Sequence, residues 1–269
     1  MKNTNSYCNK GETMVNFTRK PRYGYEDLLE IIRLLRSPEG CPWDKVQTHA
    51  SIRRGLLEEA YEAAEAIDLD NAGLLQEELG DVMMQVIFHA SIEEDAGHFN
   101  LDDVADAACR KLIFRHPALF GKEGGQSWEE LKHREKGFST RTEALDAVAR
   151  SLPSTWRARK IQKRAADTGF DWPDAVGPLA KVDEEAQELH QAVAEQSNVE
   201  EELGDLLFAV VNAARHLGID PEQALNRASD KFISRFARME RAHPEDWSEK
   251  PTAELLDMWR QAKTEERSE

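Results

Sequence analysis

Residues 77 to 90 read EELGDVMMQVIFHA, and residues 201 to 214 read EELGDLLFAVVNAA. In both stretches the apolar residues recur three and four positions apart, which is the spacing of one face of an α-helix. The same acids and the same glycine begin each apolar run. The sequence therefore predicts two long helices that share one design.

Helical spacing dominates the rest of the chain as well. Leu28, Leu29, Ile32 and Leu35 repeat at three- and four-residue intervals, and alternating β-branched runs bounded by turns are absent. The sequence predicts an all-α protein of about ten helices. Turn-forming residues place the expected helix breaks at 37–44, 68–73, 116–125, 168–174 and 218–221.

Short motifs recur in the same order along the two halves of the sequence. This order predicts an internal duplication, with a flexible tail at 1–22 and two related helical-bundle domains at 23–150 and 151–269. The matched motifs are GCPWD (40–44) and GFDWPD (169–174), EEAYE (58–62) and EEAQE (184–188), KLIFR (111–115) and KFISR (231–235), and WEELK (128–132) and WRQAK (259–263).

The composition excludes several classes of protein. The chain has 269 residues and a formal net charge of −16, which disfavours nucleic acid or an anionic membrane as a partner. Its three cysteines form no CxxC pair, so neither a disulfide framework nor a thiolate zinc site is expected. No apolar run approaches the roughly 20 residues that span a bilayer. We expect a cytoplasmic protein without a signal peptide.

The acids around the repeated motifs fall on shared helix faces. Residues three apart lie about 60° apart around a helix axis, so Glu59 and Glu62 share a face, as do Glu78 and Asp81. The two helices follow each other after a short turn and should pack antiparallel, which brings both pairs into one pocket. The second half repeats this arrangement with Glu185, Glu188, Glu202 and Asp205.

Four clustered carboxylates repel one another unless a proton, a basic side chain or a cation neutralises them. Oxygen ligands without His or Cys suit Mg²⁺ or Mn²⁺ better than zinc. Gly80 and Gly204 each cost a helix about 1 kcal/mol relative to alanine, which indicates that a neighbouring helix or a ligand approaches closely. Leu57, Leu79 and Val82 place the acids beside expected core residues. The alternative interpretation is a solvated acidic helix face.

EEAYE followed by ELGD (78–81), with fifteen residues between Glu62 and Glu78, resembles the EExxE…ExxD signature of the MazG-type all-α nucleoside triphosphate pyrophosphohydrolases. EEAQE followed by ELGD (202–205) repeats the signature with thirteen residues between. The resemblance covers nearly everything after residue 24. It implies Mg²⁺-dependent hydrolysis of NTPs and dNTPs, with broad base specificity, to a nucleoside monophosphate and pyrophosphate, as nucleotide-pool housekeeping.

The resemblance also implies roles for individual residues, and we expect the second half to be active because Lys181 lies one turn before its acids. Glu201, or Glu77 in the first half, would orient or deprotonate water beside Glu202 and Asp205. Asn198 stands where the family often has a lysine, which predicts a weaker phosphate contact. The implied metal ligands are Glu59, Glu62, Glu78, Asp81, Glu185, Glu188, Glu202 and Asp205. The implied substrate-binding residues are Lys181, Asn198, Lys231, Arg235, Trp259 and Lys263.

Two other classes of protein remain open on the residues alone. A di-iron bundle needs two ExxH pairs on core helices, and the chain has Glu130–His133 and Glu240–His243 in polar surroundings. A non-catalytic helical scaffold would use the acids to dock a basic partner. The family resemblance also implies a homo-oligomer, most simply a homodimer. No role is assigned to His89.

Overall fold

The computed structural model describes residues 16–120 and 137–266 and is all-α over these ranges, as the sequence predicts. Ten α-helices and one short 3₁₀-helix lie within the described residues, and no strand does. No described helix is long and apolar enough to cross a membrane. The motif WEELK and the pair Glu130–His133 lie outside the described residues.

The chain divides into two compact units, Met1–Gly125 and Gln126–Glu269. The sequence placed the domain boundary near residue 150, but helix α6 (Arg141–Asp146) belongs to the second unit because it packs against α7 (Ser154–Ala166). Arg164 on α7 donates a hydrogen bond to the carbonyl oxygen of Ala144. The origin of the two units by duplication stays a prediction.

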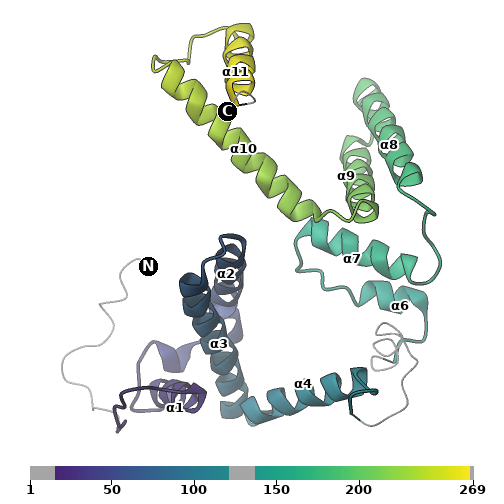
Figure 1. Cartoon of the computed structure of the whole chain (residues 1–269). Helices are drawn as coiled ribbons and strands as arrows, with labels where there is room; N and C mark the ends of the chain where they lie inside the picture. The colour runs from purple at the N-terminus through teal and green to yellow at the C-terminus, as the bar shows by residue number, and fades with distance from the viewer. Residues whose placement is uncertain (1–15, 121–136, 267–269) are drawn as a thin grey trace. The chain divides into compact units, whose positions relative to one another are not determined.

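The first unit is built around a pair of long antiparallel helices (Figure 1). Ile32, Ile52, Ile87 and Phe88 form its buried core, which joins three of the helices. Arg33 on the first helix donates to Glu94 on the third at 2.7 Å. The elements are α1 (Tyr25–Arg36), the 3₁₀-helix η1 (Asp44–Val46), α2 (His49–Asp68), α3 (Ala72–Asp95) and α4 (Leu101–Arg115).

A polar cluster joins the start of α2 to α3. His49 Nδ1 lies 2.7 Å from His89 Nδ1, and the two rings stack with centroids 5.0 Å apart. Glu93 binds His49 Nε2 at 2.5 Å and His98 Nδ1 at 2.6 Å. His89 Nε2 is buried without a hydrogen-bond partner, and burial followed by the charge of His49 lowers the pKa of His89.

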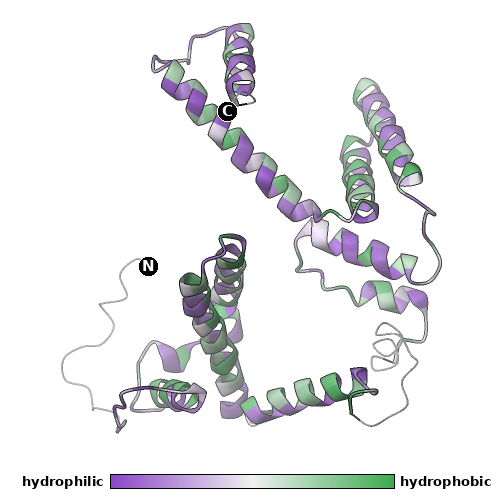
Figure 2. Ribbon diagram, viewed as in Figure 1, coloured by the Kyte–Doolittle hydropathy of each residue, from purple (hydrophilic) through white to green (hydrophobic). Residues whose placement is uncertain are grey.

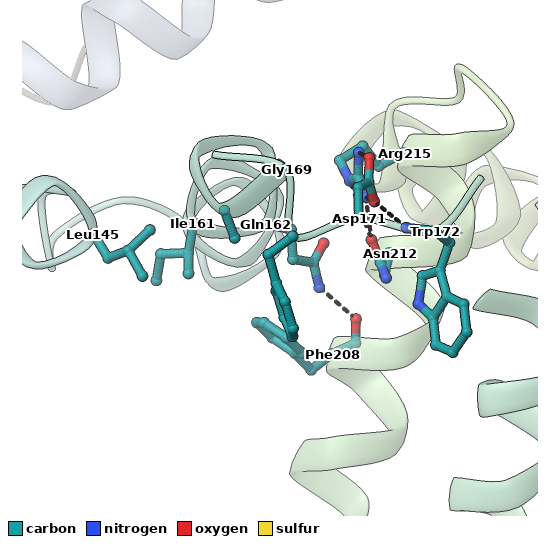
Figure 3. A pocket seen from close by; sticks show the side chains of 11 residues that line it. Leu145, Ile161, Gln162, Gly169, Asp171, Trp172, Phe208, Asn212 and Arg215 are labelled. Carbon is teal, nitrogen blue, oxygen red and sulfur yellow. Dashed lines mark hydrogen bonds and ion pairs between the residues drawn. The ribbon is translucent and has the colours of Figure 1, made fainter. Parts of the chain in front are cut away.

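The described part of the second unit contains a second antiparallel pair, α8 and α9, and four further helices. Gln162 on α7 donates from Nε2 to the carbonyl oxygen of Phe208 at 2.8 Å, which ties α7 to α9 (Figure 3). Met239, Met258 and Ala262 form the buried contact between α10 and α11. The remaining elements are α8 (Val176–Glu195), α9 (Val199–His216), α10 (Pro221–Ala242) and α11 (Thr252–Glu266).

Both hairpins turn within three residues, and each turn contains a non-glycine residue in the left-handed region. Asp70 has φ of 50° between α2 and α3, and Gln196 has φ of 52° between α8 and α9. Asn71 caps α3 by accepting a hydrogen bond from the Leu74 amide at 3.2 Å. The predicted breaks at 68–73, 168–174 and 218–221 each overlap the gap between two helices.

One expectation about the core is wrong within this chain. Leu57 and Leu79 are 41% and 51% exposed, and Val82 is only half-buried. The reason is that a hairpin of two helices covers one apolar side of each helix and leaves the other open. Figure 2 shows apolar residues along much of α3 and α9, and Leu203 and Leu207 on α9 are exposed as well.

Candidate functional site

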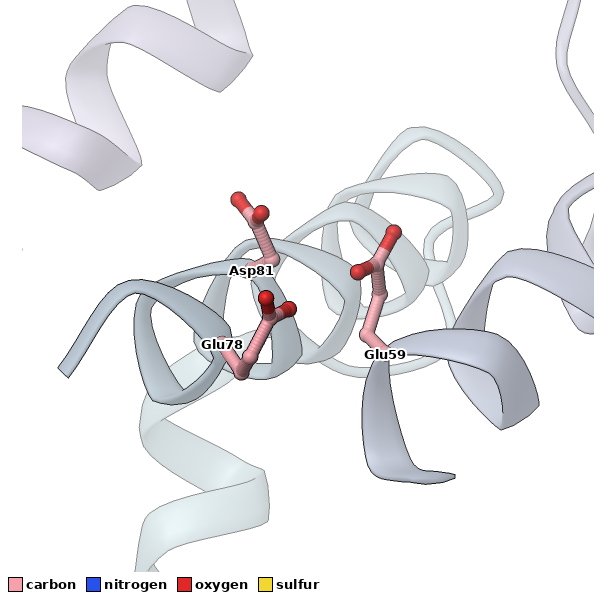
Figure 4. A group of neighbouring side chains, drawn as sticks. All are labelled: Glu59, Glu78 and Asp81. Carbon is pink, nitrogen blue, oxygen red and sulfur yellow. The ribbon is translucent and has the colours of Figure 1, made fainter. Parts of the chain in front are cut away.

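The first hairpin gathers three of its four predicted acids. Glu59 on α2 and Glu78 and Asp81 on α3 each offer one carboxylate oxygen, and these oxygens lie within 4.8 Å of one another (Figure 4). Glu78 is buried, whereas Glu59 and Asp81 are half-buried. Glu62 is exposed but close enough to Glu78 to form a hydrogen bond with it.

These acids disturb one another's ionisation. Burial raises the pKa of Glu59, and the negative charges of Asp81, Glu62 and Glu78 raise it further. Burial also raises the pKa of Glu78, followed by the charge of Glu62. The mutual repulsion of the carboxylates that the sequence predicts is therefore present in this cluster.

The second hairpin repeats the arrangement. Glu185 on α8 and Glu202 and Asp205 on α9 bring one carboxylate oxygen each within 4.8 Å of one another. Glu188, one turn after Glu185, is exposed, and desolvation followed by the charge of Glu185 raises its pKa. Lys181 opposes this rise through its positive charge.

Two neighbours hold the acids of the second hairpin. Lys181 Nζ lies 2.6 Å from Glu185 Oε1 and 2.7 Å from Glu184 Oε1, and these contacts raise the pKa of Lys181. Asn198 Nδ2 donates to Glu202 Oε1 at 2.6 Å. Glu185 Oε2 is buried without a hydrogen-bond partner. A buried carboxylate oxygen left unpaired is what a bound cation would satisfy.

The donor set fits a hard divalent cation. Both clusters offer carboxylate oxygens without sulfur or imidazole nitrogen, and such ligands suit Mg²⁺ or Mn²⁺. Among the described residues the grouped acids include neither Glu240 nor His243, so the described part of the chain gives the di-iron alternative no support.

The two hairpins differ in what surrounds the acids. Lys181 lies four residues before Glu185, and the matching position before Glu59 holds Gly55. Asn198 lies four residues before Glu202, and the matching position before Glu78 holds Leu74. The first hairpin therefore lacks a lysine and an asparagine at these two positions, and the Gln85 amide lies beside Gly55 instead. The sequence already distinguishes the two hairpins by Lys181.

The predicted phosphate- and base-binding residues lie on the last two helices. Arg235 lies with its guanidinium 6.0 Å from the centroid of the Trp259 ring, and Phe232 packs 4.9 Å from the same ring. Lys231 and Lys263 are exposed. Because α11 packs against α10, the structure groups these side chains with one another rather than with the acids. Their roles in substrate binding stay predictions.

Gly80 and Gly204, the repeated glycines beside the acids, lie in open surroundings. A Cβ at Gly80 or Gly204 would meet no atom within 4 Å, so neither glycine serves close packing within the described chain. Space beside the acids is left open for a ligand or a second copy. Glu201 and Glu77 are exposed and lie outside the grouped carboxylates, so their roles stay predictions too.

An all-α chain that carries paired acids on antiparallel helices has the features of a nucleotide pyrophosphohydrolase. The MazG nucleotide pyrophosphohydrolase domain matches residues 47–120 and 178–239, and these two segments contain both acidic hairpins. The chain belongs to the MazG family.

Relatives match over most of the chain. The nucleoside triphosphate pyrophosphohydrolase/pyrophosphatase MazG of Thermotoga maritima is 44% identical over 245 residues, which cover 89% of this chain and 95% of the relative. The nucleoside triphosphate pyrophosphohydrolase of Escherichia coli K12 is 42% identical over 255 residues, covering 89% and 97%. The uncharacterized protein YabN of Bacillus subtilis is 44% identical over 88% of this chain and 51% of its own length.

Proposed function

We propose that this chain hydrolyses nucleoside triphosphates to a nucleoside monophosphate and pyrophosphate, with a divalent cation held by the acids of its hairpins. The observation that carries the proposal is the convergence of Glu185, Glu202 and Asp205 within 4.8 Å, with one buried oxygen of Glu185 unpaired. The printed names of the relatives from Thermotoga maritima and Escherichia coli support the same reaction.

Glu185, Glu188, Glu202 and Asp205 would hold Mg²⁺, with Mn²⁺ as a substitute. When bound, the cation supplies charge neutralisation for the triphosphate and lowers the pKa of a bound water. The chain's own residues orient the reactants: Asn198 fixes the Glu202 carboxylate through its amide. Glu201 would take the proton of the attacking water.

The bond changes of this reaction are simple. The water oxygen bonds to the α-phosphorus, the bond between that phosphorus and the bridging oxygen breaks, and pyrophosphate leaves with the bonding electrons. Lys181 carries a positive charge beside the acids and would turn toward the phosphates once a cation takes its place against Glu185. A lysine can follow a phosphate because its ammonium is a point charge on a flexible stem.

We assign the reaction to the second hairpin. Lys181 and Asn198 accompany its acids, whereas Gly55 and Leu74 occupy the matching positions in the first hairpin. A cation held in the first hairpin would bind phosphate oxygens without a lysine ammonium beside it, so the second hairpin offers the phosphates more positive charge. Broad base specificity and a role in keeping nucleotide pools clean belong to the same proposal.

We also propose a homodimer. Exposed apolar residues follow the open side of both hairpins, and monomeric proteins rarely leave such continuous apolar surface in water. Light scattering on the purified chain tests this proposal, and a monomer at micromolar concentration would refute it. The exposed residues include Leu57, Leu79, Met83 and Val86 in the first unit and Leu203, Leu207 and Val210 in the second.

The deciding experiment incubates the chain with each common NTP and dNTP, with Mg²⁺ or with chelator, and separates the products by chromatography. We expect metal-dependent monophosphate and pyrophosphate that are lost in Glu202→Gln and kept in the matched variant Glu78→Gln. Diphosphate and phosphate as products would refute cleavage of the α–β anhydride. No turnover in any condition would favour an acidic scaffold instead.

A further inference from the structure

A chain of hydrogen bonds in the first unit links four polar side chains, and we term it the histidine relay. His89 Nδ1 lies 2.7 Å from His49 Nδ1, and His49 Nε2 lies 2.5 Å from Glu93 Oε1. Glu93 Oε2 in turn lies 2.6 Å from His98 Nδ1. His49 is the first residue of α2, whereas His89 and Glu93 lie one turn apart on α3. The relay therefore connects the start of α2 to α3.

The relay is separate from the acidic cluster of the same unit. His49 precedes Glu59 by ten residues, and His89 follows Asp81 by eight. After burial, the charge of His49 is what acts on the pKa of His89. The other charged groups on the helices around the relay have partners of their own or face water. They are Arg33 and Arg36 on α1, paired with Glu94 and Asp95, Arg54 on α2, paired with Glu58, Asp103 on α4, which accepts from the Asn100 amide, and the exposed Arg53 and Asp102.

The hydrogen positions in the relay follow from its partners. Hydrogen bonds from His98 and His49 lower the pKa of Glu93, so its carboxylate is ionised at neutral pH. An ionised carboxylate only accepts hydrogen bonds, and His49 Nε2 therefore carries a hydrogen. A neutral His49 then has a bare Nδ1, which accepts from the Nδ1–H group of His89. His89 Nε2 consequently carries no hydrogen, and this nitrogen is buried without a hydrogen-bond partner.

The two imidazoles have no favourable place for one more proton. A proton at His89 Nε2 would create a buried N–H group without an acceptor, which is costly. A proton at His49 Nδ1 would make two N–H groups face each other across 2.7 Å, so that hydrogen bond would be lost. A positive charge on His49 would also lie at the positive end of α2. One added proton therefore destabilises the contact between α2 and α3.

The position of His49 determines how the contact opens. Its ring lies between His89 and Glu93, and the contact with Glu93 is already 2.5 Å long. The ring therefore cannot move away from His89 along the relay and has to turn out of it. The His49 side chain is 45% exposed, so it can turn into water. This movement breaks both contacts that join the first residue of α2 to α3.

We propose that the histidine relay is a proton-sensitive latch that fixes the start of α2 against α3 at neutral pH and opens when the His49–His89 pair binds one proton. The opening is local, because Ile52 remains in the core one turn further along α2 and Arg33 still joins α1 to Glu94 on α3. The latch contains none of the predicted metal ligands and does not depend on the proposed hydrolysis.

Hydrogen–deuterium exchange of the full chain, followed by mass spectrometry, tests the latch between about pH 7.5 and 5.5. The informative amides are those of residues 53–56, which bond to the first turn of α2, and amides 82–86 in the middle of α3 are the internal reference. Rates are corrected for the intrinsic effect of pH on exchange. A one-proton switch changes the ratio of closed to open states by at most about tenfold per pH unit. We expect the protection of 53–56 to fall by up to this factor as the pH decreases, and that of 82–86 to stay constant.

Two variants separate the latch from other titrating groups. His89→Leu removes the buried imidazole, so the protection of 53–56 should no longer depend on pH. His190→Gln replaces an exposed histidine on α8 and serves as the matched control, which should respond to pH as the wild type does. His49→Gln takes the place of His89→Leu if that variant does not fold, because an amide donates to Glu93 without titrating. The same loss of pH dependence is expected there.

Three outcomes would overturn the latch. Constant protection of 53–56 in the wild type over this range would refute it without any variant. A folded His89→Leu or His49→Gln chain with the wild-type pH response would show that another group is responsible. An equal fall in the protection of 82–86 would show that the whole unit unfolds, rather than the start of α2 alone.

Discussion

Replacing Lys181 by methionine should strengthen metal binding and weaken nucleotide binding at the same time. The ammonium lies 2.6 Å from Glu185 Oε1, so a cation that uses this carboxylate must displace it or bind beside a like charge. The Lys181 side chain is 40% exposed, and an ion pair screened to this degree is worth about 1 kcal/mol. This energy corresponds to about fivefold tighter Mg²⁺ binding in the variant.

Isothermal titration of the chain with Mn²⁺ in the absence of nucleotide measures the first effect, and the KM for ATP measures the second. Lys181→Arg keeps the charge and should bind Mn²⁺ as the wild type does. Lys163→Met removes an exposed ion pair with Asp167 on α7 and serves as the matched control. Weaker or unchanged Mn²⁺ binding in Lys181→Met would show that the lysine does not compete with the cation.

Three further results are expected. The raised pKa of Glu59 means that the folded state binds protons more readily than the unfolded state, so this contribution to stability is present at acidic pH and is lost as the pH rises from about 4.5 through the raised value. With chelator present, Glu59→Gln should therefore raise the melting temperature at neutral pH by a few degrees, because the variant removes a charge that the fold disfavours. A melting temperature below that of the wild type would contradict this account. The lowered pKa of His89 has the opposite sign, because the fold favours the neutral ring. Its contribution is present above the ordinary value of 6.5 and is lost as the pH falls below it, so the wild type should lose more stability than His89→Leu between pH 7 and about 5.5, as followed by circular dichroism. Gln196→Gly should raise the free energy of unfolding by about 0.5 kcal/mol, because glycine adopts a φ of 52° without strain; a loss measured by urea denaturation would argue against strain at this turn.

Much of the fold followed from local spacing in the sequence. The three- and four-residue recurrence after Glu78 and Glu202 and the turn residues between the helices predicted both antiparallel hairpins. The convergence of Glu59 with Asp81, and of Glu185 with Asp205, followed as well because helix geometry and a short turn leave little freedom. These parts depend on contacts between neighbours along the chain.

Other features depend on contacts that spacing does not encode. The exposure of Leu57 and Leu79 depends on how many helices surround the hairpin, and the apolar pattern is the same for a covered and an uncovered face. The contact between Gln162 on α7 and Phe208 on α9 joins residues far apart in the sequence, and helical spacing does not predict which helices meet. Because α6 packs against α7, α6 belongs to the second unit. Helical spacing does not encode this contact either.

The two hairpins start their second helices at different distances from the acids. Glu78 is the seventh residue of α3, whereas Glu202 is the fourth residue of α9 and lies in its first turn. The connecting turns are equally long, so the shorter spacing in the second half shortens the helix rather than the turn. Glu202 therefore lies beside backbone amides that have no partner within the helix, in the positive field of a helix start. A difference of two residues in chain length therefore places the acids of one copy at a helix start, beside free backbone amides, and those of the other copy inside a helix.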